Sequence, residues 1–84
     1  MEIRKVENNK KMYLDLLLLA DEQEDMVDRY LERGTMYVLE DNGVKAECVV
    51  TDEGDGILEL KNIAVEPAAH GKGYGKAMVD FLIH

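Results

Sequence analysis

The sequence predicts a small α/β (α+β) domain built on a mostly antiparallel sheet. Three observations indicate this fold class. Strand-like segments follow one another with short turns between them, two helical stretches separate the first strand from the second, and a glycine-rich loop leads into a last helix. Strands joined by tight turns form hairpins, and hairpins pair in antiparallel fashion. We therefore expect the order β-α-α-β-β-β-α in a single domain, 1–84, with a thin core.

The N-terminal part predicts one strand and two helices. Residues 3–6 form a short strand candidate, and apolar residues recur at helical spacing between positions 10 and 20. Asp21 is expected to cap a second helix, with Glu24 completing a pair that resembles a capping box. The run of acidic residues there thus has a structural explanation, and we do not interpret it as a metal site.

The middle of the chain predicts three consecutive strands. The dipeptide Asn42-Gly43 is a strong signal for a two-residue hairpin turn between residues 36–40 and 44–51. Cys48 falls on an apolar face of the second of these strands, which predicts a small buried side chain rather than a nucleophile. Residues 57–65 are expected to form the longest strand, which Pro67 ends.

Charge and composition limit the classes of partner. The net charge is −8, and from Asp21 to Glu59 there are 13 acidic residues against three basic ones. Such a field repels nucleic acid and attracts cations; the acidic residues are either solvated faces or an acidic approach to a site that takes an amine. No apolar run approaches the length of a membrane span, the start of the sequence lacks a signal peptide's apolar core, and the single cysteine excludes an internal disulfide. We expect a cytoplasmic protein with no nucleic-acid or membrane partner.

The most informative segment is the loop His-Gly-Lys-Gly-Tyr-Gly-Lys at residues 70–76. Glycines allow the backbone to approach a ligand, and the N-terminus of the following helix offers unpaired N–H groups, so the segment could hold a phosphate or diphosphate. A tight turn with solvated lysines is the alternative. The spacing does not match the P-loop, and the dinucleotide fingerprint fails because Lys76 stands where its third glycine is required.

Together with the preceding Asn-Ile-Ala-Val-Glu-Pro at residues 62–67, this loop resembles the acetyl-CoA signature of the GNAT family of N-acetyltransferases. His70 departs from the usual Gln or Arg at the start of the motif. The resemblance implies acetyl-CoA as acetyl donor, no metal, and a primary amine of a small molecule or protein as acceptor. In the histone-acetylating branch of the family a glutamate at this offset is the general base, which implies this role for Glu59, on a strand face that could bury it in part. The alternative is that Glu59 is a surface strand residue paired with Lys61. The implied cofactor-binding residues are Ile63, Ala64, Val65, His70, Gly71, Lys72, Gly73, Tyr74, Gly75 and Lys76.

The resemblance also implies that the domain is partial. Members of the family continue beyond the helix that ends near His84, so we expect a chain truncated after the acetyl-CoA loop and its helix, with the C-terminal half of the fold missing. That last helix is apolar on nearly all sides and the strand at residues 57–65 has a free edge. A homodimer could cover both surfaces. A non-catalytic CoA-binding or dimerisation module is the alternative to an enzyme.

Overall fold

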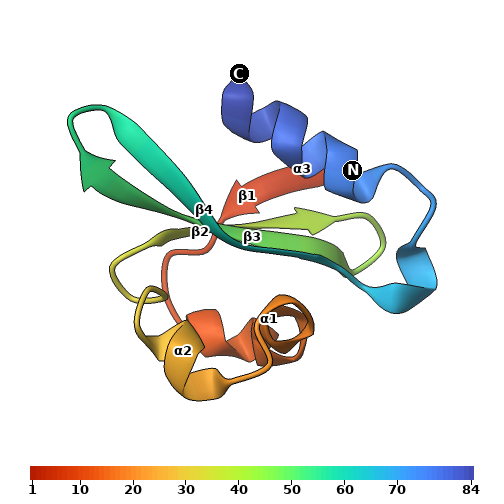
Figure 1. Ribbon diagram of the computed structural model, residues 1–84. Helices are drawn as coiled ribbons and strands as arrows, with labels where there is room; N and C mark the ends of the chain where they lie inside the picture. The colour runs from red at the N-terminus through yellow and green to blue at the C-terminus, as the bar shows by residue number, and fades with distance from the viewer.

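The computed structural model describes residues 1–84 and confirms the predicted fold class. Four antiparallel strands form one sheet in the order β1-β2-β3-β4. Helices α1 and α2 cover one face of this sheet and α3 lies on the other (Figure 1). The strands are β1 (Glu2–Lys5), β2 (Thr35–Glu40), β3 (Val44–Gly54) and β4 (Ile57–Val65), and the helices are α1 (Leu14–Ala20), α2 (Glu24–Asp28) and α3 (Tyr74–Ile83).

The hairpin between β2 and β3 turns at the predicted dipeptide, but its loop has three residues, 41–43, rather than two, and the pairing is irregular between Leu39 and Glu40. Asn42 and Gly43 both have positive φ angles, of 56° and 104°. Two such residues in succession match the right-handed twist of the flanking strands, which is why asparagine and glycine are favoured there. The predicted bounds 57–65 are those of β4, but β4 is not the longest strand: it has nine residues, whereas β3 has 11.

The two N-terminal helices are shorter than the sequence predicted. Asn9 adopts a left-handed conformation, and residues Lys10–Tyr13 form a 3-10 turn before α1 begins. The expectation that Asp21 caps the second helix is wrong: its backbone is extended at the end of α1, and α2 begins only at Glu24. The Tyr30 hydroxyl donates to Asp21 Oδ2 at 3.2 Å. The Asp21 carboxylate therefore forms a tertiary hydrogen bond instead of capping the N-terminus of α2, as the sequence pattern had predicted.

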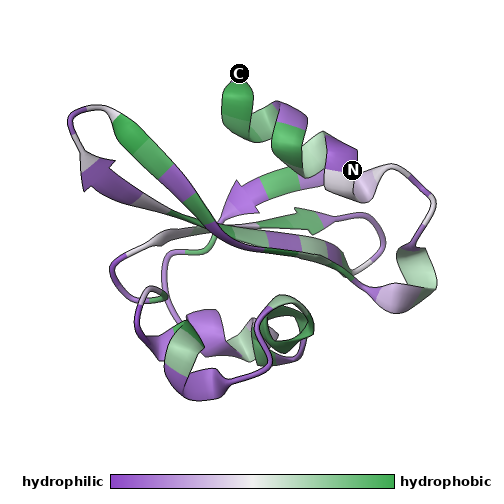
Figure 2. Cartoon of the chain, viewed as in Figure 1, coloured by the Kyte–Doolittle hydropathy of each residue, from purple (hydrophilic) through white to green (hydrophobic).

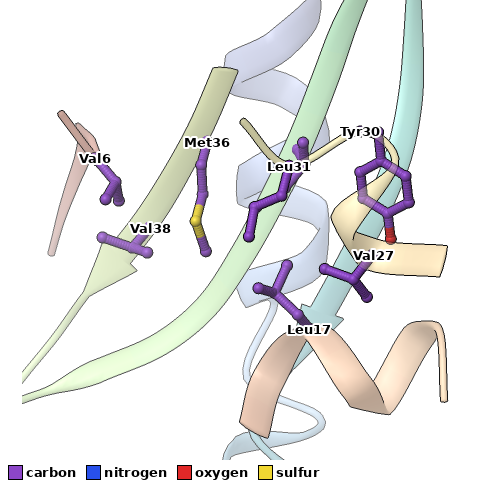
Figure 3. Close-up of a cluster of buried hydrophobic side chains, with 8 residues drawn as sticks. Val6, Leu17, Val27, Tyr30, Leu31, Met36 and Val38 are labelled. Carbon is purple, nitrogen blue, oxygen red and sulfur yellow. The ribbon is translucent and has the colours of Figure 1, made fainter. Parts of the chain in front are cut away.

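Two separate apolar clusters hold the helices to the sheet. The first cluster lies beneath α1 and α2, where Leu17 and Val27 meet Met36 and Val38 of β2 (Figure 3). The second cluster lies beneath α3 and includes Met78 and Cys48. Cys48 is fully buried, as predicted, and burial raises the pKa of its thiol to about 12. The sheet is therefore buried on both faces along β3.

A bulge interrupts the pairing of β3 with β4. Val49 lies opposite Asn62 but Val50 lies opposite Leu60, so Lys61 is an extra residue. The bulge turns Asn62 towards α1, where its Nδ2 donates to the Leu17 carbonyl oxygen at 3.0 Å. Ile63, the next residue, packs with the second cluster. The alternation of side chains between the two faces of the sheet is therefore reversed at this point of β4.

The far end of the β3–β4 hairpin extends away from the rest of the molecule (Figure 1). Its apolar residues Ile57, Leu58 and Leu60 are 58%, 65% and 44% exposed, and they form hydrophobic stretches along the projecting strand (Figure 2). None of the helices combines the length and apolar character that a membrane crossing requires.

Candidate functional site

Six consecutive backbone amides, from Gly71 to Lys76, donate no hydrogen bond within the protein. The amides on either side of them are satisfied: His70 N–H bonds the Pro67 carbonyl oxygen at 3.3 Å, and Ala77 N–H bonds the Gly73 carbonyl oxygen at 3.0 Å. The last three of the six belong to the first turn of α3, where the helix dipole is positive. A row of free N–H groups at such a helix end is suited to a phosphate or diphosphate.

Two glycines determine the backbone conformation of the loop. Gly71 and Gly73 have φ angles of 83° and 82°, a left-handed region that other residues enter at a cost, and Gly73 is the N-terminal cap of α3. A Cβ atom at either position would meet nothing within 4 Å. The glycines are therefore needed for backbone conformation, and the space beside them is open for a ligand.

Two side chains hold the loop in place. His70 Nε2 donates to the carbonyl oxygen of Val65 at 3.0 Å and so closes the loop onto the end of β4. The hydroxyl of Tyr74 donates to Asp41 Oδ2 at 2.6 Å and ties the start of α3 to the β2–β3 turn. This bond lowers the pKa of Asp41, which the positive charges of Lys45 and Lys72 lower further.

The two lysines of the loop differ in their surroundings. Lys76 pairs with Asp80, one helical turn later, at 2.8 Å, which raises the pKa of the ammonium group. Lys72 is exposed and forms no ion pair. We call the six amides from Gly71 to Lys76 the anion cradle. Of the two lysines in this segment, Lys72 is the one without a carboxylate partner.

The outer edge of β4 lies beside the loop and has no neighbouring strand. Glu66 N–H bonds the Lys45 carbonyl oxygen at 2.8 Å, towards β3. Because successive residues of a strand point their N–H and C=O groups to opposite sides, those of Val65 and Ile63 point to the free edge. The N–H and C=O groups of Ala64 point towards β3 instead. Of the three strand residues predicted to pair with a ligand, only Ile63 and Val65 therefore have backbone groups on the free edge.

An open cavity of about 370 Å³ lies between this edge and α3. Eight of the ten predicted cofactor-binding residues line it, all but Lys72 and Lys76. A second cavity of about 310 Å³ lies on the α1 side of the same edge and shares Ile63, Ala64, Val65 and His70 with the first. The structure thus brings the strand edge and the loop together around one space, of a size typical of ligand pockets.

Glu59, the predicted base, lies outside both cavities. Its side chain is 53% exposed, and Oε1 accepts from Lys61 Nζ at 2.9 Å. The expectation that this strand face buries Glu59 in part is wrong, because Glu59 lies on the hairpin that projects from the sheet. No group of three or more histidine, cysteine, aspartate or glutamate side chains is arranged to hold a metal ion.

One buried carboxyl escaped the sequence analysis. Glu47, in the middle of β3, has no exposed surface, and neither carboxylate oxygen has a hydrogen-bond partner. Burial raises its pKa to about 8. The signal available in the sequence was a single carboxylate between two apolar residues, Ala46 and Cys48, in the middle of a predicted strand.

Comparison with known proteins identifies the family. Residues 32–84 match the family model described as an acetyltransferase (GNAT) domain. The chain belongs to the GNAT acetyltransferase family. The matched region contains β2, β3, β4, the glycine loop and α3, which include the free amides and the free strand edge described above.

Several GNAT relatives resemble the chain closely. It is 40% identical over 74 residues to the uncharacterized N-acetyltransferase YvbK of Bacillus subtilis, a match covering 87% of this chain and 47% of that protein. Among solved structures, an IAA acetyltransferase from Bacillus cereus superposes with a TM-score of 0.90 at 31% identity, over 98% of this chain and 55% of the other.

Two further structures contain ligands. A GNAT family acetyltransferase from Elizabethkingia anophelis with acetyl-CoA bound has a TM-score of 0.90 at 29% identity, over 98% of this chain and 54% of the other. A Bacillus subtilis acetyltransferase in complex with CoA has a TM-score of 0.88 at 36% identity, over 98% and 55%. The chain therefore spans about half the length of the GNAT proteins that it matches.

Proposed function

We propose that this GNAT chain binds acetyl-CoA and that the protein transfers the acetyl group to a primary amine. The observation that carries the proposal is the row of six unsatisfied amides from Gly71 to Lys76. They would hold the diphosphate, with the positive charge of Lys72 beside them. Ile63 would offer its outward N–H and C=O groups, and Val65 its N–H, to the pantetheine arm, as a neighbouring strand would; the Val65 carbonyl oxygen already accepts from His70. Two relatives of the same fold are described with acetyl-CoA or CoA bound, which supports this assignment.

With acetyl-CoA held in this way, backbone and side-chain groups of the chain could take part in acetyl transfer. Acetyl-CoA, when bound, supplies an activated thioester. The Val65 N–H, on the free edge of β4, would stabilise negative charge on the thioester oxygen during attack. Transfer forms the amide C–N bond, breaks the C–S bond, and moves one proton from the amine to a base and one to the departing thiolate. Glu59 remains our candidate for the base.

Binding can be tested by calorimetric titration of CoA and acetyl-CoA into the protein and into Gly73→Ala. The matched control is Gly43→Ala: Gly43 also has a positive φ and open space for a Cβ, but lies in the β2–β3 turn. Each variant is expected to lose about 1–2 kcal/mol of stability to backbone strain. Only Gly73→Ala should bind CoA more weakly. Equal affinities for both variants, or no binding by the unaltered protein, would remove the anion cradle from the proposal.

Transfer can be tested by following thiol release from acetyl-CoA over a panel of primary amines. Cys48 will not interfere, because its thiol is buried and its pKa is raised to about 12. Binding without thiol release for any amine would favour the non-catalytic CoA-binding module. The proposed setting for this reaction is the cytoplasm, since the only cysteine is free rather than disulfide-bonded.

We also propose that the 84-residue chain on its own forms a homodimer. A hydrophobic groove lies between the projecting hairpin and α3, lined by Val50, Leu58, Leu60, Val79, Leu82 and Ile83. The edge of β4 lies next to it, so one surface offers both apolar side chains and free backbone groups. Sedimentation should give a dimer mass at micromolar concentration, and replacing Leu58 and Leu60 by lysine should give a monomer. A monomer before substitution would contradict the proposal.

A further inference from the structure

The clearest unexplained feature of the structure is a group of three buried acceptor oxygens without a donor. They are Oε1 and Oε2 of Glu47 and Oδ1 of Asn62. Both side chains are buried, at 0% and 3% exposure. An unpaired buried polar atom costs free energy, and an unpaired buried charge costs far more, so this group requires an explanation.

Glu47 and Asn62 are diagonal neighbours on one face of the sheet. Glu47 lies opposite Ala64 and Asn62 lies opposite Val49 in the β3–β4 pairing. Val49 belongs to the cluster under α1 and α2, and Glu47 shares its face through strand alternation. Diagonal pairs of this kind are within reach of long side chains. The amide nitrogen of Asn62 is already engaged, since it donates to the Leu17 carbonyl oxygen and to the Tyr30 hydroxyl, each at 3.0 Å.

No other side chain supplies the missing donor. Tyr30, which follows α2, gives its hydroxyl proton to Asp21 at the end of α1. Further along β4, Lys61 pairs with Glu59. From β2 the neighbour of Glu47 is Val38, and on its own strand Cys48 points into the opposite cluster. Among the side chains around this group, the donor that is left is a proton on the carboxyl group itself.

We propose that Glu47 carries a proton in the folded protein, donates it to Asn62 Oδ1, and thereby positions the bulge of β4. The raised pKa of Glu47, about 8, agrees with this assignment. Asn62 is itself bonded to the Leu17 carbonyl oxygen of α1, and it immediately precedes Ile63, so the bond would fix the point from which the free edge of β4 continues. Glu47 is thus a positioning residue that never touches a ligand. The positioning role depends on the proposed CoA function, whereas the protonation state does not.

The protonation state is tested first, on the unaltered protein. A titration of the glutamate side-chain carbons by NMR should show one carboxyl with a midpoint near 8, and the Glu47→Gln variant should lack that resonance. A midpoint near 4.5, the ordinary value, would overturn the proposal. This measurement does not depend on CoA binding or on any variant that fails to fold.

Stability provides an independent readout. The pKa of Glu47 is about 4.5 in the unfolded chain and about 8 in the folded one. Its contribution to folding is therefore fully present below about pH 4.5 and is lost as pH rises towards 8. Glu47→Gln keeps a donor but cannot ionise, so its stability relative to the unaltered protein should increase over that range. A difference that is constant with pH would contradict a protonated Glu47.

The positioning role is tested by the affinity for CoA. At pH 7, Glu47→Gln should bind like the unaltered protein, whereas Glu47→Leu, which fills the space without a donor, should bind about five- to tenfold more weakly, the equivalent of one net hydrogen bond. Above pH 8 the affinity of the unaltered protein for CoA should fall below that of Glu47→Gln. Titration of CoA itself affects both proteins equally, so it does not contribute to this difference. Equal affinity of Glu47→Leu would refute the positioning role. No CoA binding by any variant would instead reject the proposed function.

Discussion

The hydroxyl of Tyr74 donates to Asp41 Oδ2 at 2.6 Å and joins the first residue of α3 to the turn between β2 and β3. These two residues are 33 positions apart in the sequence. The bond fixes the end of α3 that carries the free amides, so the geometry of the anion cradle depends on a turn at the other end of the matched region.

Replacing Tyr74 by phenylalanine should loosen the start of α3 while leaving its ring packed. We expect CoA affinity to fall about fivefold, roughly the effect of one net hydrogen bond, with a small decrease in the unfolding midpoint. Calorimetric titration measures the first quantity and thermal unfolding the second. An unchanged affinity together with a lowered midpoint would show that the bond stabilises the fold without setting the cradle.

The two loop lysines should contribute unequally to binding. Lys72→Ala removes the positive charge that has no carboxylate partner, and should weaken CoA binding several-fold, with a smaller dependence on salt. Lys76→Ala removes a charge that Asp80 already offsets, so its effect should be smaller. Titrations at two ionic strengths distinguish the cases. A larger effect for Lys76 would mean that its pairing with Asp80 breaks on binding.

Substitution of Glu59 by glutamine tests the general base. If Glu59 accepts the amine proton, turnover at neutral pH should fall by about 10²–10⁴ with little change in CoA affinity. Lys61→Gln is the control, because it removes the ion pair but keeps the carboxylate. Turnover that Glu59→Gln leaves unchanged would remove Glu59 from the mechanism.

The two core clusters should respond differently to a cavity. Leu17 and Met78 are both fully buried, one in each cluster. Truncation of either to alanine should cost about 2–5 kcal/mol of unfolding free energy, measured with urea. At temperatures where both variants remain folded, only Met78→Ala should weaken CoA binding, since Met78 seats α3. Equal losses of affinity would indicate that the two layers are coupled through the sheet.

The thiol of Cys48 should report on opening of the sheet. It is buried in the second cluster, and its pKa is raised to about 12, chiefly by burial. We expect no reaction with an aromatic disulfide reagent at pH 8 in the native protein, and complete reaction in urea. Rapid native labelling would mean that the α3 layer detaches readily.

Sequence alone predicted β4 and the loop because their signals are local. The strand is indicated by its own apolar and β-branched residues and by the proline that follows it, and the loop is indicated by glycines directly before a helix. Each of these signals depends only on residues a few positions apart. The start of α2 was predicted wrongly because the Asp21 carboxylate accepts a hydrogen bond from Tyr30. A local sequence pattern does not reveal such a contact. Glu47 and Asn62 were missed because a bulge reverses the alternation of β4, and because burial of β3 on both faces is a property of the assembled layers.

The free amides also affect how the protein is handled. A row of N–H groups from Gly71 to Lys76 has no means of distinguishing one oxyanion from another before the rest of a ligand arrives. Inorganic phosphate or sulfate in a purification buffer will therefore compete for the same position. Titrations performed in such buffers are expected to understate affinity, whereas a buffer without an oxyanion group, such as a simple amine with chloride as counter-ion, leaves the amides open to the nucleotide.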